Sequence, residues 1–99
     1  MPTKQDLSTG MPSDETLIAR VARQDASAFE MLYDRHAAVV LGACLKLIGD
    51  RAVAERILQE TFWQVWQGAV AYQPQKGSFT SWLFRIAWEL VREARLTIE

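Results

Sequence analysis

Apolar side chains recur every three or four residues along most of the chain, which is the spacing of one face of an α-helix. Four helices follow from this pattern. They are expected over about residues 13–24, from residue 27 to the glycine at 49, over residues 51–67, and from about residue 78 onward. No stretch has the alternating pattern of a β-strand. The pattern therefore predicts an all-α fold, a compact bundle of about four helices with short connections.

Residues that start or stop helices stand at the ends of these segments. Asp14 and Glu15 suit the positive end of the first helix, and Ser27 with Glu30 has the spacing of a capping box. The expected caps and stops are Ser13, Ser27, Gly49, Asp50 and Gly68.

The same periodicity predicts which side chains form the core. The first helix contributes Leu17, Ile18 and Val21. The second contributes Phe29, Leu32, Tyr33, His36, Val40, Ala43, Cys44 and Leu47. The third contributes Ala54, Ile57, Leu58, Thr61, Phe62 and Val65. The fourth contributes Trp82, Leu83, Ile86, Ala87, Leu90, Val91 and Ala94.

Composition describes one ordinary globular domain. The chain has 99 residues, 49% of them apolar and 23% charged, with a net charge of −1. Residues 1–12 mix Pro, Gly, Ser and Thr without apolar periodicity, so we expect a flexible leader there and a helical domain over residues 13–99. The leader has neither a basic start nor a long apolar run, and we expect a cytoplasmic protein without membrane insertion.

Signatures of enzymes and metal sites are missing from the sequence. The single cysteine, Cys44, lies among apolar residues, which indicates a place in the core. The single histidine, His36, has no second ligand at metal-binding spacing. Glu30 and Asp34 share a helix face with solvated charges, which disfavours acid–base catalysis. We expect no enzyme, no catalytic residue, no metal and no cofactor.

A surplus of aromatic residues points instead to a binding module. Six crowd into the stretch from Phe62 to Trp82, more than a core this small can hide. Trp63 lies on the polar face of the third helix, which suits a basic partner helix, although a merely solvated face is an alternative. The loop over residues 69–78 could accept an unstacked base, or be a plain turn.

Three stretches together resemble region 2 of the extracytoplasmic-function (ECF) group of bacterial RNA polymerase sigma factors. They are AFEMLYDRH at 28–36; LIGD at 47–50 followed by AE at 54–55 and LQETFWQVW at 58–66; and FTSWLFRIA at 79–87. The resemblance covers about residues 14–96. Each segment alone is modest evidence, but all of them at this spacing are highly specific.

This resemblance implies partners and roles. The third helix would dock on the clamp helices of the polymerase β′ subunit, and the loop and fourth helix would capture bases of the melted non-template −10 strand. The expected polymerase-binding residues are Glu55, Gln59, Glu60, Phe62, Trp63 and Trp66. The expected DNA-binding residues are Tyr72, Gln73, Lys76, Ser78, Phe79, Trp82, Arg85 and Arg92.

The chain also departs from the family pattern. Arg56 stands where family members commonly have an acidic residue, and Trp88-Glu89 replaces the usual Arg-Asn of the fourth helix. We expect no second, −35-reading (region 4) domain in this chain; a fragment and a stand-alone version stay equally open. The alternative function is a sigma-like protein–protein module without promoter recognition, for example one bound by an anti-sigma factor.

Overall fold

A computed structural model describes residues 11–98 of the chain. It consists of helices α2 (Asp14–Val21), α3 (Ala26–Ile48), α4 (Arg51–Gly68) and α5 (Phe79–Ile98). Two 3-10 turns, Ala69–Ala71 and Pro74–Lys76, lie between α4 and α5. The predicted all-α fold is confirmed. Most of the predicted leader, residues 1–10, lies outside the described residues.

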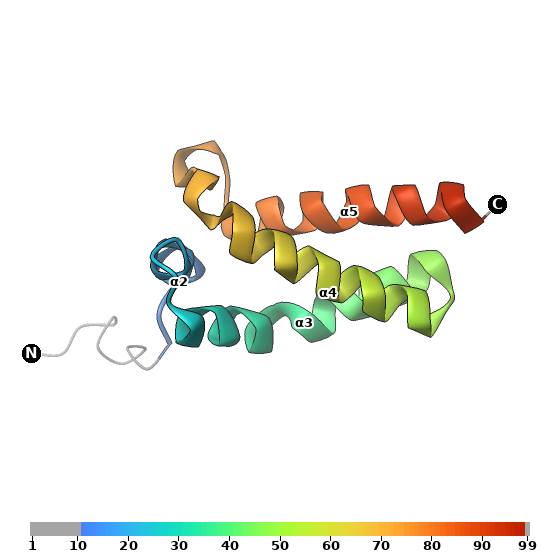
Figure 1. The fold of residues 1–99 in the computed structure, drawn as a ribbon, viewed down its shortest axis with the longest axis horizontal. Coiled ribbons are helices and arrows are strands. Elements are labelled where there is room, and N and C mark those ends of the chain that lie inside the picture. Colours follow the sequence, from blue (N-terminus) through green and yellow to red (C-terminus); the bar gives the residue numbers. More distant parts are fainter. Residues whose placement is uncertain (1–10, 99) are drawn as a thin grey trace, which may run out of the picture.

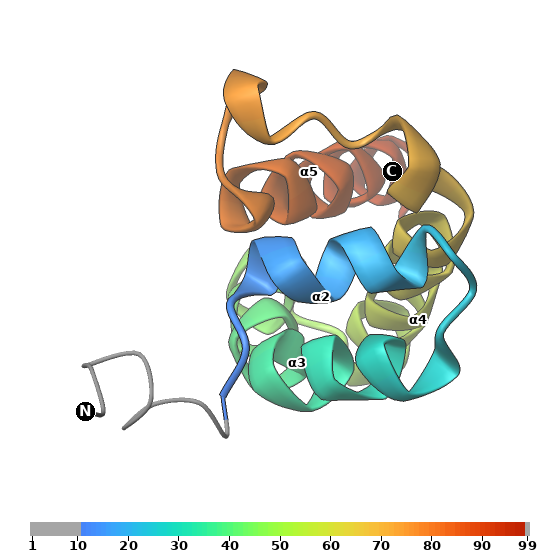
Figure 2. The ribbon, with the colours of Figure 1, turned by 90° about the vertical axis from the view of Figure 1, so that its left-hand side faces the viewer.

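The three long helices lie roughly side by side, and the short one crosses their end (Figure 1). α4 runs opposite to α3 and α5. α2 lies across the end of the bundle between α3 and α5, and Figure 2 shows it spanning the two. The loop from α4 to α5 is at this same end. The crossing helix is therefore placed to hold both the long helices and the loop.

Several predicted helix ends are confirmed by their caps. The Ser13 side chain accepts a hydrogen bond from the Thr16 N–H, and Asp50 does the same for Val53. Gly49 ends α3 in the left-handed conformation, with φ of 77°, where a glycine has no Cβ to clash.

The start of α3 differs from the prediction. Asp25 is the cap, and its carboxylate accepts from the N–H groups of Ser27 and Ala28 at 3.0 and 3.2 Å. Ser27 therefore lies inside the helix, and its capping box does not form. The Arg20 guanidinium donates to Asp25 at 3.0 Å. This bond, followed by the one from Ala28, lowers the pKa of Asp25, and the charged form is the better cap.

The core lies where the four helices meet and matches most of the predicted apolar faces. Its largest fully buried side chains include Phe79, Leu17, Ile18, Leu32, Leu83 and Val40. The buried Thr61 hydroxyl donates to the Ile57 carbonyl at 2.7 Å, so it adds no unpaired polar group. Cys44 is buried as predicted, and burial raises the pKa of its thiol. Leu47 is a correction: it is 45% exposed, because it lies at the far end of α3 beside an open groove on α5.

Alanine substitutions at two glycines, one inside α3 and one at its C-terminal end, should change the free energy of unfolding in opposite directions. Gly42 lies inside α3 with open space around its missing Cβ, so Gly42→Ala should stabilise the fold by about 0.5–1 kcal/mol. Gly49 also has open space but a φ of +77°, so Gly49→Ala should cost about 1–2 kcal/mol. Urea denaturation followed by circular dichroism measures both. Shifts of the same sign would contradict the backbone assignment at Gly49.

Candidate functional site

Three aromatic rings form the junction between the loop and the start of α5. The Phe79 centroid lies 6.3 Å from that of Tyr72 and 6.0 Å from that of Trp82, and the two outer rings are 5.2 Å apart. Phe79 is fully buried, whereas Tyr72 and Trp82 are half-buried. This corrects the expectation for Phe79. The first turn of α5 points its ring into the core, so it supports the two outer rings and cannot itself touch DNA in this conformation.

The outer rings border a pocket of about 230 Å³, called the base pocket below. Its lining residues are Ala71, Tyr72, Gln73, Lys76, Gly77, Ser78, Ser81, Trp82 and Arg85. It thus brings together six of the residues predicted to bind DNA: Tyr72, Gln73, Lys76, Ser78, Trp82 and Arg85. Rings, an amide, hydroxyls and two cations around one hollow can stack a planar base and neutralise a phosphate.

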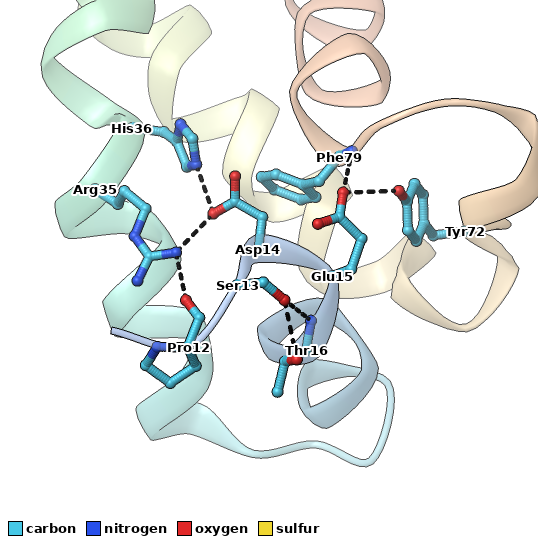
Figure 3. Close-up of polar contacts among 9 residues, drawn as sticks. All are labelled: Pro12, Ser13, Asp14, Glu15, Thr16, Arg35, His36, Tyr72 and Phe79. Atoms are coloured by element: carbon cyan, nitrogen blue, oxygen red, sulfur yellow. Dashed lines mark hydrogen bonds and ion pairs between the residues drawn. The ribbon is translucent and has the colours of Figure 1, made fainter. Parts of the chain in front are cut away.

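A single carboxylate fixes this junction from α2. Glu15 accepts a hydrogen bond from the Phe79 backbone N–H at 3.0 Å, and its carboxylate lies 3.5 Å from the Tyr72 hydroxyl (Figure 3). The Tyr72 hydroxyl donates its single proton to the Gly77 carbonyl at 2.8 Å. Glu15 therefore satisfies a free N–H at the positive end of α5 and places a wall of the base pocket.

The loop is closed by further local contacts. The Ser78 hydroxyl accepts from the Ser81 N–H at 3.1 Å, which starts α5. Burial, followed by the nearby Glu15 and Asp14 charges, raises the pKa of the Tyr72 phenol. Tyr72 therefore stays protonated and remains a donor near neutral pH.

The other carboxylate of α2 binds α3. Asp14 accepts from Arg35 at 2.9 Å and lies 3.0 Å from the His36 ring nitrogen (Figure 3). Arg35 also donates to the Pro12 carbonyl at 2.8 Å.

Within residues 11–98 no group of three or more acidic, His or Cys side chains is arranged to hold a metal ion. His36 contacts the Phe79 ring at 5.5 Å between centroids and helps to pack it.

The exposed side of α4 carries most of the residues predicted to bind polymerase. Glu55, Gln59, Glu60 and Trp63 are exposed, Trp63 by 54%. We call these four residues, together with Trp66, the docking face. Trp66 is half-buried, and its ring packs edge-on against Phe29 with centroids 5.4 Å apart.

Phe62 is the second predicted site residue, after Phe79, that the structure shows to be buried. It is 2% exposed, and its ring packs against Tyr33 and Phe29 of α3 at 4.9 and 6.2 Å. It lies on the inner side of α4, one of the positions the apolar pattern assigned to the core. The family resemblance had also placed it in the polymerase contact, but in this conformation it is covered.

Arg92 is exposed on α5 but does not line the base pocket. It lies about two turns beyond Arg85 and borders separate hollows with Trp88. Its predicted role therefore concerns a different part of the surface from the loop.

Comparison with known protein families gives one match. Residues 32–96, which include α4, the loop and most of α5, match the Sigma-70 region 2 family. The chain belongs to this family. The ECF RNA polymerase sigma factor SigK of Mycolicibacterium vanbaalenii is 37% identical over 73 residues, which are 74% of this chain and 37% of that protein. SigK of Mycobacterium tuberculosis is 33% identical over 73 residues, 74% of this chain and 39% of that protein.

The match has clear bounds. The Sigma-70 region 2 chain spans somewhat over a third of the length of the curated relatives it matches. No solved structure gives a significant match.

Sigma factors are transcription initiation factors and not enzymes, which agrees with the sequence prediction. In the described part of the chain, no helix combines the length and apolar character needed to cross a membrane.

Sequence reasoning missed the role of Glu15. Its position after Ser13 indicated only a favourable charge at the start of α2. Its partners, Tyr72 and Phe79, are 57 and 64 residues away along the chain. A sequence signal for this contact was absent, because an acidic first turn is common in helices whether or not it has a tertiary partner.

Removing the Glu15 carboxylate should loosen the region 2 junction. Glu15→Ala should cost about 1–2 kcal/mol of unfolding free energy, because the Phe79 N–H at the start of α5 loses its charged acceptor. Glu15→Gln keeps one acceptor oxygen and should lose less. Urea denaturation gives the cost, and amide hydrogen exchange at Phe79 locates it.

Glu30→Ala is the matched control, because Glu30 is exposed on α3 and has no hydrogen bond or ion pair from its side chain within residues 11–98. Equal costs for Glu15→Ala and Glu30→Ala, with unchanged exchange at Phe79, would remove Glu15 from this role.

Proposed function

We propose that this domain binds RNA polymerase core through the docking face and holds bases of the melted −10 promoter strand at the base pocket. The partner on polymerase is the pair of clamp helices of the β′ subunit, and the DNA is the non-template strand. The domain works in the cytoplasm, where transcription takes place. The relatives' names support the first partner, since they are called RNA polymerase sigma factors.

One observation carries the DNA half of this proposal. The base pocket gathers residues from the loop and from α5 that the sequence predicted separately to contact DNA. Its two cations, Lys76 and Arg85, form no ion pair within the described residues, so their charges are available to a phosphate. Tyr72 and Trp82 provide ring surfaces, and base stacking tolerates any sequence. A base flipped out of the stack fits such a hollow.

The docking face supports the polymerase half. Glu55 is exposed one turn before the exposed pair Gln59 and Glu60, and Trp63 places an exposed ring beside them. Carboxylates and amides around an exposed tryptophan suit a basic helical partner, with the ring as the anchor. Arg51 already pairs with Glu55 at 2.9 Å, but both side chains are well exposed and such a pair exchanges partners at little cost.

A second function, a sigma-like protein–protein module without promoter recognition, is favoured by one observation. Glu89 is exposed on the side of α5 that continues from the base pocket, where a carboxylate repels phosphate. In that case the partner is an anti-sigma protein, and the docking face or α5 is its binding surface. DNA binding by the polymerase-bound domain separates the two functions.

Substitutions on the two surfaces should have separable effects. The double variant Gln59→Ala with Glu60→Ala should weaken binding to polymerase core by about tenfold, since it removes two polar contacts of a docking helix. Trp82→Ala should leave that affinity within about twofold and weaken capture of the opened strand by about 1–3 kcal/mol, the value of one stacked base. Binding to labelled core and promoter-opening assays measure the two.

Arg23→Gln is the control, because Arg23 is exposed between α2 and α3, away from both surfaces. Circular dichroism checks that each variant keeps its helices. Strand capture that survives Trp82→Ala while polymerase binding falls would favour a different DNA surface. Intact polymerase binding by the double variant would overturn the docking face.

A further inference from the structure

A hollow lies between α4 and α5, apart from the base pocket. α4 runs opposite to α5, so the first half of α4 faces the last turns of α5 (Figure 1). Glu60 of the docking face lines this hollow, which therefore continues the docking face onto α5. We call it the seam hollow. It has a volume of about 310 Å³ and is lined by Arg56, Ile57, Glu60, Leu90, Glu93, Ala94 and Thr97.

The seam hollow combines an apolar floor with a charged rim. Ile57 and Ala94 are buried, and Leu90 is half-buried. Glu60 of α4 and Glu93 of α5 are exposed, so each helix contributes one carboxylate to the rim. Lysine and arginine side chains have an aliphatic stem that packs on apolar surface and a cationic end that stays at the rim. The lining is therefore complementary to a side chain of this kind.

Both carboxylates of the rim are available to a partner. Neither Glu60 nor Glu93 forms an ion pair within the described residues. Another pair on α4 shows that this is not a consequence of spacing. Arg51 pairs with Glu55 four residues later at 2.9 Å, whereas Arg56 and Glu60 have the same spacing and do not pair. The charge of Glu60 is therefore not used inside the domain.

We propose that the seam hollow receives a lysine or arginine side chain from the polymerase helix that binds the docking face, and that Glu93 is a polymerase-binding residue. The inference rests on the proposed function and extends the contact from α4 to α5. Glu93 was not among the residues predicted from the sequence to bind polymerase. A cation that meets two carboxylates while its stem leaves water gains more than a cation in a single exposed ion pair.

Arg56 determines which sign of charge the seam hollow favours. Its guanidinium lines the same hollow and repels a cationic occupant. The two carboxylates outweigh this one guanidinium, so the rim still favours a cation. An acidic occupant would pair with Arg56 but be repelled by Glu60 and Glu93. Removing Arg56 and removing Glu93 should therefore change the affinity for polymerase in opposite directions.

The substitution Glu93→Gln removes the charge and keeps the shape of the side chain. It should lower the affinity of the full chain for polymerase core by about threefold at low salt, the size expected for one ion pair near the surface. The difference should shrink as salt is added, because salt screens exposed charges. Fluorescence anisotropy of the labelled chain, titrated with core at several salt concentrations, measures both.

The fold should not change in this variant. The Thr97 hydroxyl donates to the backbone carbonyl of Glu93 at 2.9 Å, and this bond does not involve the substituted side chain. Circular dichroism checks that the helices remain.

Two further variants test the assignment of charge. Glu89→Gln is the matched control, because Glu89 is exposed one turn earlier on α5 but lines a different hollow; it should leave the affinity for core unchanged. Arg56→Gln should raise this affinity by about twofold, since it removes a like charge from the rim. A general loss of structure cannot produce both a tighter and a weaker variant.

The outcomes distinguish this inference from the proposed function. If the double variant Gln59→Ala with Glu60→Ala binds core as tightly as the unsubstituted chain, the proposed docking fails and the inference fails with it. If the double variant binds weakly and Glu93→Gln binds like Glu89→Gln, only the inference is overturned. It is likewise overturned if Arg56→Gln weakens binding, which would indicate an acidic occupant, or if the loss in Glu93→Gln is independent of salt.

Discussion

The backbone N–H of Phe79 donates to Glu15 while the Phe79 ring lies in the core, and this pair of contacts fixes the start of α5. The loop before it has two short 3-10 turns and few buried side chains of its own. Its shape therefore depends on how its end is held. Because Tyr72 reaches the same carboxylate, one side chain of α2 sets both a wall of the base pocket and the helix end beside it.

This dependence gives the short α2 a role beyond its size. Eight residues form a marginal helix in isolation, but Asp14 binds α3 through Arg35 and His36, and Glu15 binds the loop and α5. Charge-assisted hydrogen bonds are worth more than neutral ones. Two adjacent carboxylates therefore join elements that are distant in the chain, and Figure 2 shows the helix lying between them.

Periodicity predicted the helices and most of the core, because both depend on local spacing. It also recognised Gly49 and Asp50, whose conformations are set by immediate neighbours. It placed the start of α3 at Ser27 instead of Asp25, since only the folded chain shows the Arg20 guanidinium that binds Asp25. The burial of Phe79 likewise depends on tertiary packing, whereas the exposure of Trp63 agrees with its predicted place on the polar face of α4. The sequence shows that this region has more aromatic rings than a small core can bury. Which of these rings reach the surface depends also on tertiary packing.

Placement of charge also reconciles a net charge of −1 with the proposed DNA-binding role. Total charge governs long-range attraction, whereas local contacts to phosphates depend on where the cations lie. Here the cations lie along one side of α5, and the carboxylates of the docking face lie on α4. A domain built this way has little general attraction for DNA. Under the proposed function, polymerase therefore supplies the remaining affinity.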